Sequence, residues 1–172
     1  MVIYLYVLGA VLFRLIPHPW NVTPLAAMFL FSGATFRSKG RSLLVPLIAL
    51  LVSDYTVDLL LYHGVYHWFS PFTWAGFLLV GMLGWTLRGK WNWARVGGAS
   101  VAASTIFFLV SNFGVWLAWT MYPRSAAGLA ECYAAGLPFY GNSLAGDLFF
   151  SALMFGSYYW LLRRDEQRVT VG

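Results

Sequence analysis

Five polar side chains stand inside otherwise apolar stretches of this chain, and they are its best candidates for chemistry. They are Arg14, Asp54, Asp58, Asn112 and Asp147. Asp54 and Asp58 are four residues apart, a spacing that places both carboxylates on one face of a helix. Two neighbouring carboxylates in a low dielectric do not both stay ionised cheaply. We therefore expect that one of them is protonated or that Arg14 supplies the counter-charge.

Each of these residues also has a purely structural interpretation. An ion pair or triad of Arg14 with Asp54 and Asp58 would hold two helices together without binding anything else. An acidic residue such as Asp147, in the first turns of its helix, would complement the helix dipole. The sequence is compatible with both interpretations.

Three histidines and one cysteine are the remaining candidates for metal or redox chemistry. His63 and His67 have the spacing that can place two imidazoles on one metal, but no acidic residue completes a motif. We interpret them, with His18, as side chains at a membrane boundary. The single Cys132 excludes an internal disulfide, and we interpret it as a small buried hydrophobe. No nucleophile elbow, phosphate-binding glycine loop, H-E-x-x-H or C-x-x-C motif is present, so we expect neither an enzyme nor a bound cofactor.

The composition predicts that the elements carrying these residues lie in a membrane. The 172 residues are 60% hydrophobic and only 10% charged, whereas soluble domains have about 25% charged residues. This length suits one domain, and each membrane-spanning helix needs about 20 apolar residues. We predict an all-α, integral membrane six-helix bundle. The predicted helices cover residues 2–16, 24–36, 43–62, 71–87, 95–119 and 142–162, and a long outer loop covers residues 120–141.

The basic residues predict which side of the membrane each helix end faces. Nine of the eleven lie within residues 37–41, 88–95 and 163–168. Basic connections are cytoplasmic by the positive-inside rule, so the N- and C-termini are both expected to be cytoplasmic. The net charge of +5 follows from these segments and gives no reason to expect a nucleic-acid partner.

With this topology, the polar side chains fall in the outer half of the membrane. A helical rise of about 1.5 Å per residue places Asp54 roughly 17 Å and Asp58 roughly 22 Å from the inner end of their helix. Polar groups confined to the outer half predict a cavity that opens to the outside. The candidate stacking and lid residues at its rim are Trp20, Tyr62, Trp116, Tyr122 and Tyr140.

Small residues predict where two helices approach closely, because helix packing in lipid relies on Gly, Ala and Ser. Within residues 24–36 they are Ala26, Ala27, Gly33 and Ala34, and within residues 71–87 they are Gly76, Gly81 and Gly84.

Several motifs along the chain resemble a known group of membrane proteins. They are Arg14-Leu-Ile-Pro-His-Pro-Trp-Asn-Val-Thr-Pro24, Pro46, Ser53-Asp54, Ser111-Asn112-Phe113-Gly114-Val115-Trp116, Met121-Tyr122-Pro123, Pro138-Phe139-Tyr140-Gly141-Asn142 and Gly146-Asp147. The chain resembles an uncharacterised six-helix bacterial membrane protein family. In its architecture and first loop, it also resembles the S components of energy-coupling factor (ECF) vitamin transporters.

This resemblance implies a multi-pass protein of the bacterial inner membrane, with a substrate pocket in the outer half. We expect a protein that binds a vitamin-sized small molecule for uptake and does not transform it. The five polar residues would contact the ligand, and the aromatic rim residues would cover it. The expected partners are the ligand, membrane lipid and a transmembrane coupling subunit with its ATPases. The alternatives are an accessory subunit of a larger membrane complex or, third, a metal- or haem-binding subunit that uses the outer histidines.

Overall fold

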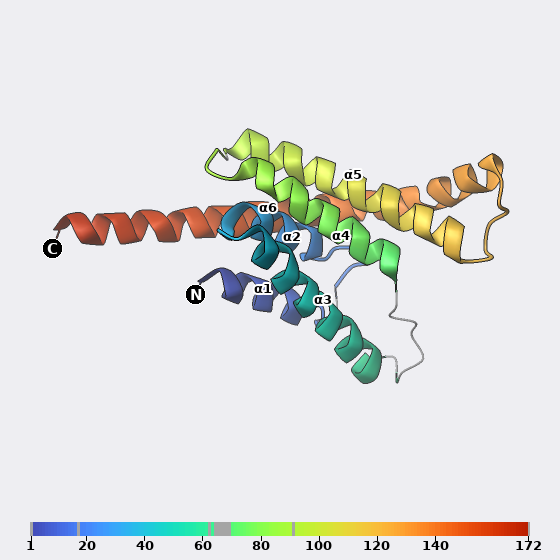
Figure 1. Ribbon diagram of the computed structural model, residues 1–172, viewed down its shortest axis with the longest axis horizontal. Helices are drawn as coiled ribbons and strands as arrows, with labels where there is room; N and C mark the ends of the chain where they lie inside the picture. Colours follow the sequence, from blue (N-terminus) through green and yellow to red (C-terminus); the bar gives the residue numbers. More distant parts are fainter. Residues whose placement is uncertain (1, 17, 62, 64–69, 91, 172) are drawn as a thin grey trace.

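The computed structural model describes the whole chain except residues 1, 17, 62, 64–69, 91 and 172, and except the side chains of residues 61 and 165–171. The part it describes is all helical, as predicted, and contains six α-helices (Figure 1). They are α1 (Val2–Phe13), α2 (Leu25–Thr35), α3 (Lys39–Leu61), α4 (Pro71–Gly84), which the 3-10 turn η1 (Trp85–Leu87) continues, α5 (Trp93–Ala118) and α6 (Ala126–Val171).

Helix α2 is the centre of the bundle. All nine residues from Leu25 to Gly33 are buried, and α2 contacts each of the other five α-helices. Its rings pack against rings of two neighbours, with 5.3 Å between the centroids of Phe29 and Phe77 of α4, and 5.3 Å between those of Phe31 and Phe155 of α6. A helix that is apolar all round lies in the core of a protein or in a membrane, and α2 lies in the core of this bundle.

The backbones of α2 and α4 touch at glycines, where the small residues predicted a close approach. A Cβ atom on Gly33 would lie 2.1 Å from the carbonyl oxygen of Gly81, and one on Gly84 would lie 2.3 Å from the carbonyl oxygen of Leu30. Neither distance leaves room for a methyl group, so glycine is required at both positions for this packing.

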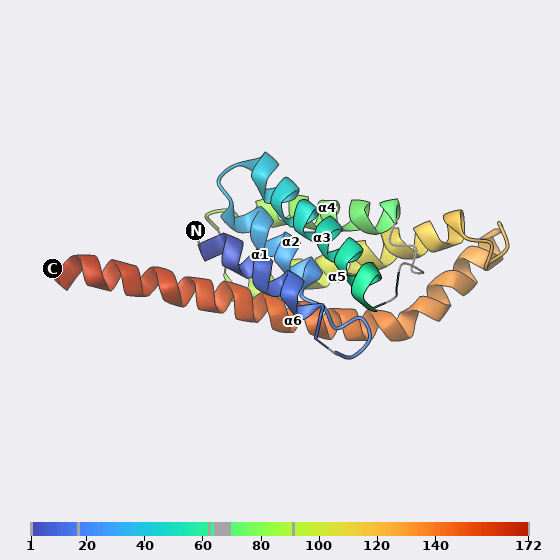
Figure 2. The same ribbon diagram turned by 90° about the horizontal axis from the view of Figure 1, so that it is seen from below.

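The basic connections lie together at one end of the bundle, which we call the basic end. Both termini point toward this end, and the α2–α3 and α4–α5 connections lie there (Figures 1 and 2). The α1–α2 and α5–α6 connections lie toward the opposite end, as do the last turn of α3 and the first turn of α4 (Figure 1). The side chains of Arg37, Lys39, Arg41, Lys90 and Arg95 are exposed at the basic end.

Two of the helices, α3 (Lys39–Leu60) and α5 (Trp93–Ala118), are long and apolar enough to cross a membrane, as judged from length and composition. Helices α1 and α2 and the segment Pro71–Leu87 are shorter apolar helices. One face of α3 is turned away from the rest of the protein, because its large side chains recur every three or four residues and are each more than half exposed. These side chains are Leu44, Ile48, Val52, Tyr55 and Leu59.

The predicted long outer loop over residues 120–141 is the main correction. Only residues 119–125 separate α5 from α6, and residues 126–141 form the first turns of α6. The alanine- and glycine-rich part of this segment, residues 126–136, was also compatible with a short helix, and alanine is the strongest helix former. Pro138 lies inside the helix, which bends along this part of its length in Figure 2, and a proline inside a helix can kink it without ending it.

Two other helix boundaries differ from the prediction near functional residues. Helix α1 ends at Phe13, so Arg14 lies just beyond its last turn, whereas the prediction placed Arg14 inside the helix. Helix α3 begins at Lys39, four residues earlier than predicted, because Lys and Arg are good helix formers and the hydroxyl of Ser38 accepts a hydrogen bond from the amide of Arg41.

The glycine contact between α2 and α4 leads to a test. We expect Gly84→Ala to lower the free energy of unfolding by about 1–3 kcal/mol, because the new methyl group would collide with backbone atoms of α2. Gly98→Ala in α5 is the matched control, since a Cβ there meets nothing within 4 Å. It should be neutral or stabilising by up to about 1 kcal/mol. Thermal unfolding of the purified proteins in one detergent measures both, and equal effects would contradict the close contact.

Candidate functional site

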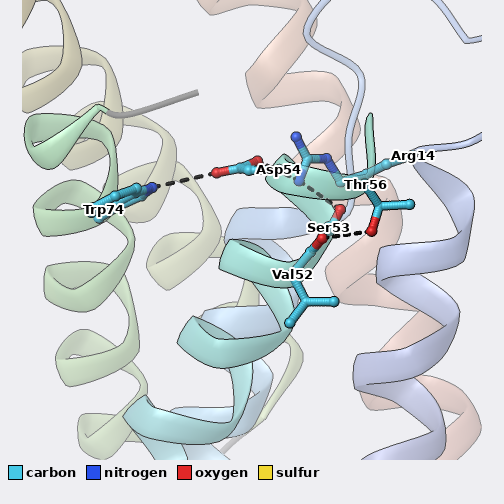
Figure 3. A network of polar contacts seen from close by, with 6 residues as sticks. All are labelled: Arg14, Val52, Ser53, Asp54, Thr56 and Trp74. Carbon is cyan, nitrogen blue, oxygen red and sulfur yellow. Dashed lines mark hydrogen bonds and ion pairs between the residues drawn. The ribbon is translucent and has the colours of Figure 1, made fainter. Parts of the chain in front are cut away.

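An ion pair between Arg14 and Asp54 is the centre of the candidate site. Arg14 Nη1 lies 2.6 Å from Asp54 Oδ1 and donates a hydrogen bond of 2.7 Å to Ser53 Oγ (Figure 3). On the other side of the carboxylate, the indole Nε1 of Trp74 in α4 donates to Asp54 Oδ2 at 3.3 Å. The side chains of Arg14 and Asp54 are 17% and 14% exposed. The expectation that Arg14 supplies the counter-charge is therefore confirmed for Asp54.

The connection between α1 and α2 carries Arg14 and forms one wall of the site. The chain leaves α1 in tight turns, in which the amides of Arg14 and Leu15 donate to the carbonyls of Val11 and Leu12 at 3.1 Å. Asn21 has a positive φ of 62°, a conformation that asparagine tolerates better than most residues.

The same connection is tied to α6. Asn142 Nδ2 donates a hydrogen bond of 3.2 Å to the carbonyl of Trp20, and the backbone of Val22 lies against Gly146, where an added Cβ would be 3.3 Å from its Cα. These two contacts hold the connection beside the part of α6 that contains Asp147.

A cavity of about 350 Å³ lies beside the ion pair. Arg14, Asp54 and Asp147 all line it, so the structure brings three of the five predicted polar residues together. Its other polar lining residues are Asn21, Thr23, Ser70, Thr73 and Ser143, and its apolar ones are Leu25, Leu50, Phe77, Phe107, Val115 and Trp119. The wall therefore combines a large apolar area with a few charged and hydroxyl groups, which is typical of small-molecule sites.

Asp147 is the most buried charged residue of this wall. It is 4% exposed and accepts a hydrogen bond of 2.5 Å from the hydroxyl of Ser104, a fully buried residue of α5. Helices α5 and α6 thus meet through a buried polar contact beside the cavity.

Asn112 and Tyr140 line a second, smaller cavity of about 220 Å³. This cavity shares Asn21, Phe107 and Ser143 with the first one, so the two are adjacent. Asn112 Nδ2 donates to the carbonyl of Phe108 at 2.9 Å, and the hydroxyls of Tyr140 and Thr105 lie 2.9 Å apart. The predicted site residues are thereby divided between two neighbouring spaces.

Among the described residues, the other predicted site residues line neither cavity. Asp58 is buried at 7% exposure on α3, and Trp20 is 79% exposed. The indole of Trp116, in α5, donates a hydrogen bond of 2.9 Å to the carbonyl of Pro123 in the α5–α6 connection. Tyr122 lies in the same connection. Tyr62 lies outside the described residues.

Sequence reasoning missed several lining residues. Asn21 lies within the first-loop motif, which was a usable signal. Thr73, Phe107 and Ser143 are ordinary residues of apolar helices, and nothing in their neighbourhood distinguishes them.

The histidines and the cysteine were the candidates for metal or redox chemistry. His18 Nδ1 lies 2.6 Å from the carbonyl oxygen of Ile16, His63 is exposed, and His67 lies outside the described residues. Within the described part of the chain, no three His, Cys, Asp or Glu side chains are placed to hold one metal ion. Cys132 is buried, as interpreted from the sequence, and its thiol donates to the carbonyl of Asn112 at 3.3 Å.

A larger cavity of about 560 Å³ lies at the basic end, between α2, α5 and α6. Thr35, Asn92, Trp93, Tyr158 and Tyr159 are among its lining residues, and none of the lining side chains is charged. We place the candidate site at the 350 Å³ cavity, because binding with specificity depends on placed charged and polar groups more than on volume.

The ion pair leads to a double-mutant test. Removing one member of a buried pair leaves the other uncompensated, so Arg14→Leu and Asp54→Leu should each lower the free energy of unfolding by roughly 3 to 5 kcal/mol. The double variant should recover much of that loss. Arg41→Leu, a change of an exposed arginine, is the control and should have little effect. Strictly additive losses in thermal unfolding would contradict a direct pair.

Comparisons with known proteins agree with the whole-chain motifs. No curated protein and no solved structure is significantly similar to the chain. The model of a family of unknown function, DUF6580, matches residues 1–169, which include every residue of the cavity wall. This match confirms the predicted membership of an uncharacterised family. The chain therefore belongs to the DUF6580 family of unknown function.

Proposed function

We propose that this protein binds a vitamin-sized small molecule in the cavity beside Arg14 and Asp54, from the side of a membrane opposite the basic end. The observation that carries the proposal is the cavity itself. Three charged side chains from three segments distant in the sequence converge on one cavity of about 350 Å³, which apolar side chains also line. This volume lies within the range of roughly 300 to 1,000 Å³ that is usual for small-molecule sites.

Contacts within the protein hold the polar groups of the cavity in place. Asp54 is held by Arg14 on one oxygen and by Trp74 on the other, while Asp147 is held by Ser104. Polar groups that are already oriented lose little conformational entropy on binding. Their arrangement supports recognition of a ligand, which is why we propose binding rather than bond-making chemistry.

The outer surface of the bundle supports a place in the membrane. Besides the exposed face of α3, helix α1 turns several large apolar side chains outward, each more than half exposed. These are Leu5, Leu8 and Leu12, followed by Ile16 just beyond the helix. Contiguous apolar surface of this extent favours contact with lipid or with another membrane protein. We propose six membrane-crossing helices in a bacterial inner membrane, with the basic end in the cytoplasm.

The motif resemblance to ECF S components supports a role in uptake. If the protein works as such a component, a transmembrane coupling subunit with its ATPases is the partner, and the outward apolar face of α1 is available to it. The accessory-subunit alternative assigns the same face to a different membrane complex, and it assigns the ion pair a structural role only.

A thermal-shift screen of vitamins and their precursors tests the binding proposal. A ligand that binds only the folded protein stabilises it by about 2.7 kcal/mol at a hundredfold excess over Kd, so a hit should raise Tm. Ser143→Phe should remove that rise, because Ser143 lines the cavity and a phenyl ring would occupy it. Ala145→Phe is the matched control, since Ala145 is exposed on the other side of α6.

If no compound raises Tm and the protein co-purifies stoichiometrically with other membrane subunits, the accessory-subunit role replaces the proposal. A hit that persists in Ser143→Phe would place the ligand elsewhere.

A labelling experiment tests the membrane orientation. Single cysteines replace Ser38 or Ser125 in a Cys132→Ser background; both serines are exposed and each accepts a backbone hydrogen bond near a helix start. In intact cells, an impermeant thiol reagent should label the cysteine at position 125 and spare the one at position 38. Permeabilised cells, in which both should react, are the control. The opposite pattern would place the cavity on the cytoplasmic side.

A further inference from the structure

We propose that the cavity beside Arg14 selects a small organic cation and that Asp147 is its counter-charge. This inference rests on the proposed function, because it names the chemical class of ligand for the same site. It follows from the charges on the wall, the burial of Asp147 and the aromatic rings beside it.

The charged side chains of the wall do not balance. The cavity is lined by one basic and two acidic residues, namely Arg14, Asp54 and Asp147. Arg14 is already paired with Asp54, at 2.6 Å. Within the described part of the chain, Asp147 makes no ion pair, and the partner of its hydrogen bond is the neutral hydroxyl of Ser104. As a carboxylate, Asp147 gives the cavity a net negative charge.

Burial makes this imbalance important. Asp147 is 4% exposed, so water solvates its carboxylate poorly. An isolated carboxylate in such a place is costly unless it is paired and hydrogen-bonded. A cationic ligand would supply the missing partner, and attraction between the two charges is stronger there than in water.

The aromatic lining fits the same class of ligand. Phe77 and Phe107 both line the cavity and stack on each other, with 4.4 Å between ring centroids and 25° between ring planes. Phe77 also stacks on Phe29, so these rings contribute apolar contact area for the ring body of a ligand, while Asp147 supplies the attraction for its charge. The hydroxyls of Thr73 and Ser143 and the side-chain oxygen of Asn21 can accept hydrogen bonds from an ammonium group.

An anionic ligand fits less well. It would have to compete with Asp54 for Arg14, whose Nη1 already contacts both Asp54 and Ser53. It would also face the unpaired carboxylate of Asp147 across the same space. A ligand of opposite sign to Asp147, with an apolar ring body, satisfies the wall without breaking the existing pair.

Three indole compounds of similar size test the charge preference directly. Tryptamine is cationic, tryptophol is neutral and indole-3-acetate is anionic at neutral pH, and all carry the same ring. Equilibrium binding to the full-length protein in detergent is measured for each. Tryptamine should bind about tenfold or more tightly than the other two, because bonds to a charged partner are worth about 1.5 to 3 kcal/mol.

Two variants assign the preference to Asp147. Asp147→Asn keeps the shape of the side chain and removes its charge, so tryptamine should then bind within about threefold of tryptophol. Glu131→Gln is the matched control, since it removes an exposed acid from the same helix outside the cavity and should keep the wild-type ratio. If Asp147→Asn does not fold, the order of the three compounds on the wild-type protein still decides.

Preference for tryptophol or indole-3-acetate, or an unchanged ratio in Asp147→Asn, would overturn the inference and leave the proposed function standing. If none of the three binds, the charge of the hit from the vitamin screen decides: a cationic hit that Asp147→Asn weakens supports the inference, and a neutral or anionic hit overturns it. If that screen finds no ligand either, the proposed function fails, and the inference fails with it.

Discussion

The burial of α2 on every side is the constraint on which the rest of this structure depends. Nine consecutive residues of α2 are buried inside the protein. Five other helices therefore cover an element only eleven residues long. Such a short helix is covered on all sides only if its neighbours come very close. The glycine contact between Gly33 and Gly84 meets this requirement on the α4 side, and bulky rings such as Phe155 meet it on the α6 side.

The position of the ion pair follows from that arrangement. With α1, α3 and α4 packed around one end of α2, the residue just beyond α1 comes within reach of the outer part of α3. Arg14 therefore meets Asp54, and Trp74 closes the other side of the carboxylate. The structural and functional interpretations of this pair do not exclude each other. With Trp74, the pair joins α3 and α4 to the connection that follows α1. It also forms part of a cavity wall that contains Asp147, a carboxylate without an ion-pair partner in the described part of the chain.

The distribution of charge along the molecule gives its two ends different characters. Exposed basic side chains surround the connections at the basic end, whereas Arg14, Asp54 and Asp147, nearer the opposite end, line a cavity. In a membrane, the first arrangement suits an anionic inner surface, and the second suits recognition of a solute from the other side. The larger of the two cavities lies at the basic end but has no charged lining residue, so cavity volume and polar lining favour different places in this fold.

Composition and local rules were enough to predict the helical class and the basic connections, because apolar stretches must form helices where water is scarce. Motifs along the chain were enough to predict the family. The pairing of Arg14 with an acid was one of two alternatives, the other being a protonated carboxyl, since a buried guanidinium needs a counter-charge. The close approach at Gly33 and Gly84 was also predicted from the sequence, since small residues in apolar helices allow two backbones to come close together.

Only the tertiary structure decided which polar residues share a space. Asp147 contacts Ser104, a residue 43 positions away, and Asn112 lies in a separate cavity although the sequence placed both near the outer ends of their helices. Which way a helix turns its side chains depends on how α5 and α6 rotate against α2, and the sequence periodicity of an all-apolar helix does not encode that rotation. Residues 126–141 are a second case in which tertiary packing was needed. Their composition allows either a loop or a helix, and packing along α5 stabilises the helix.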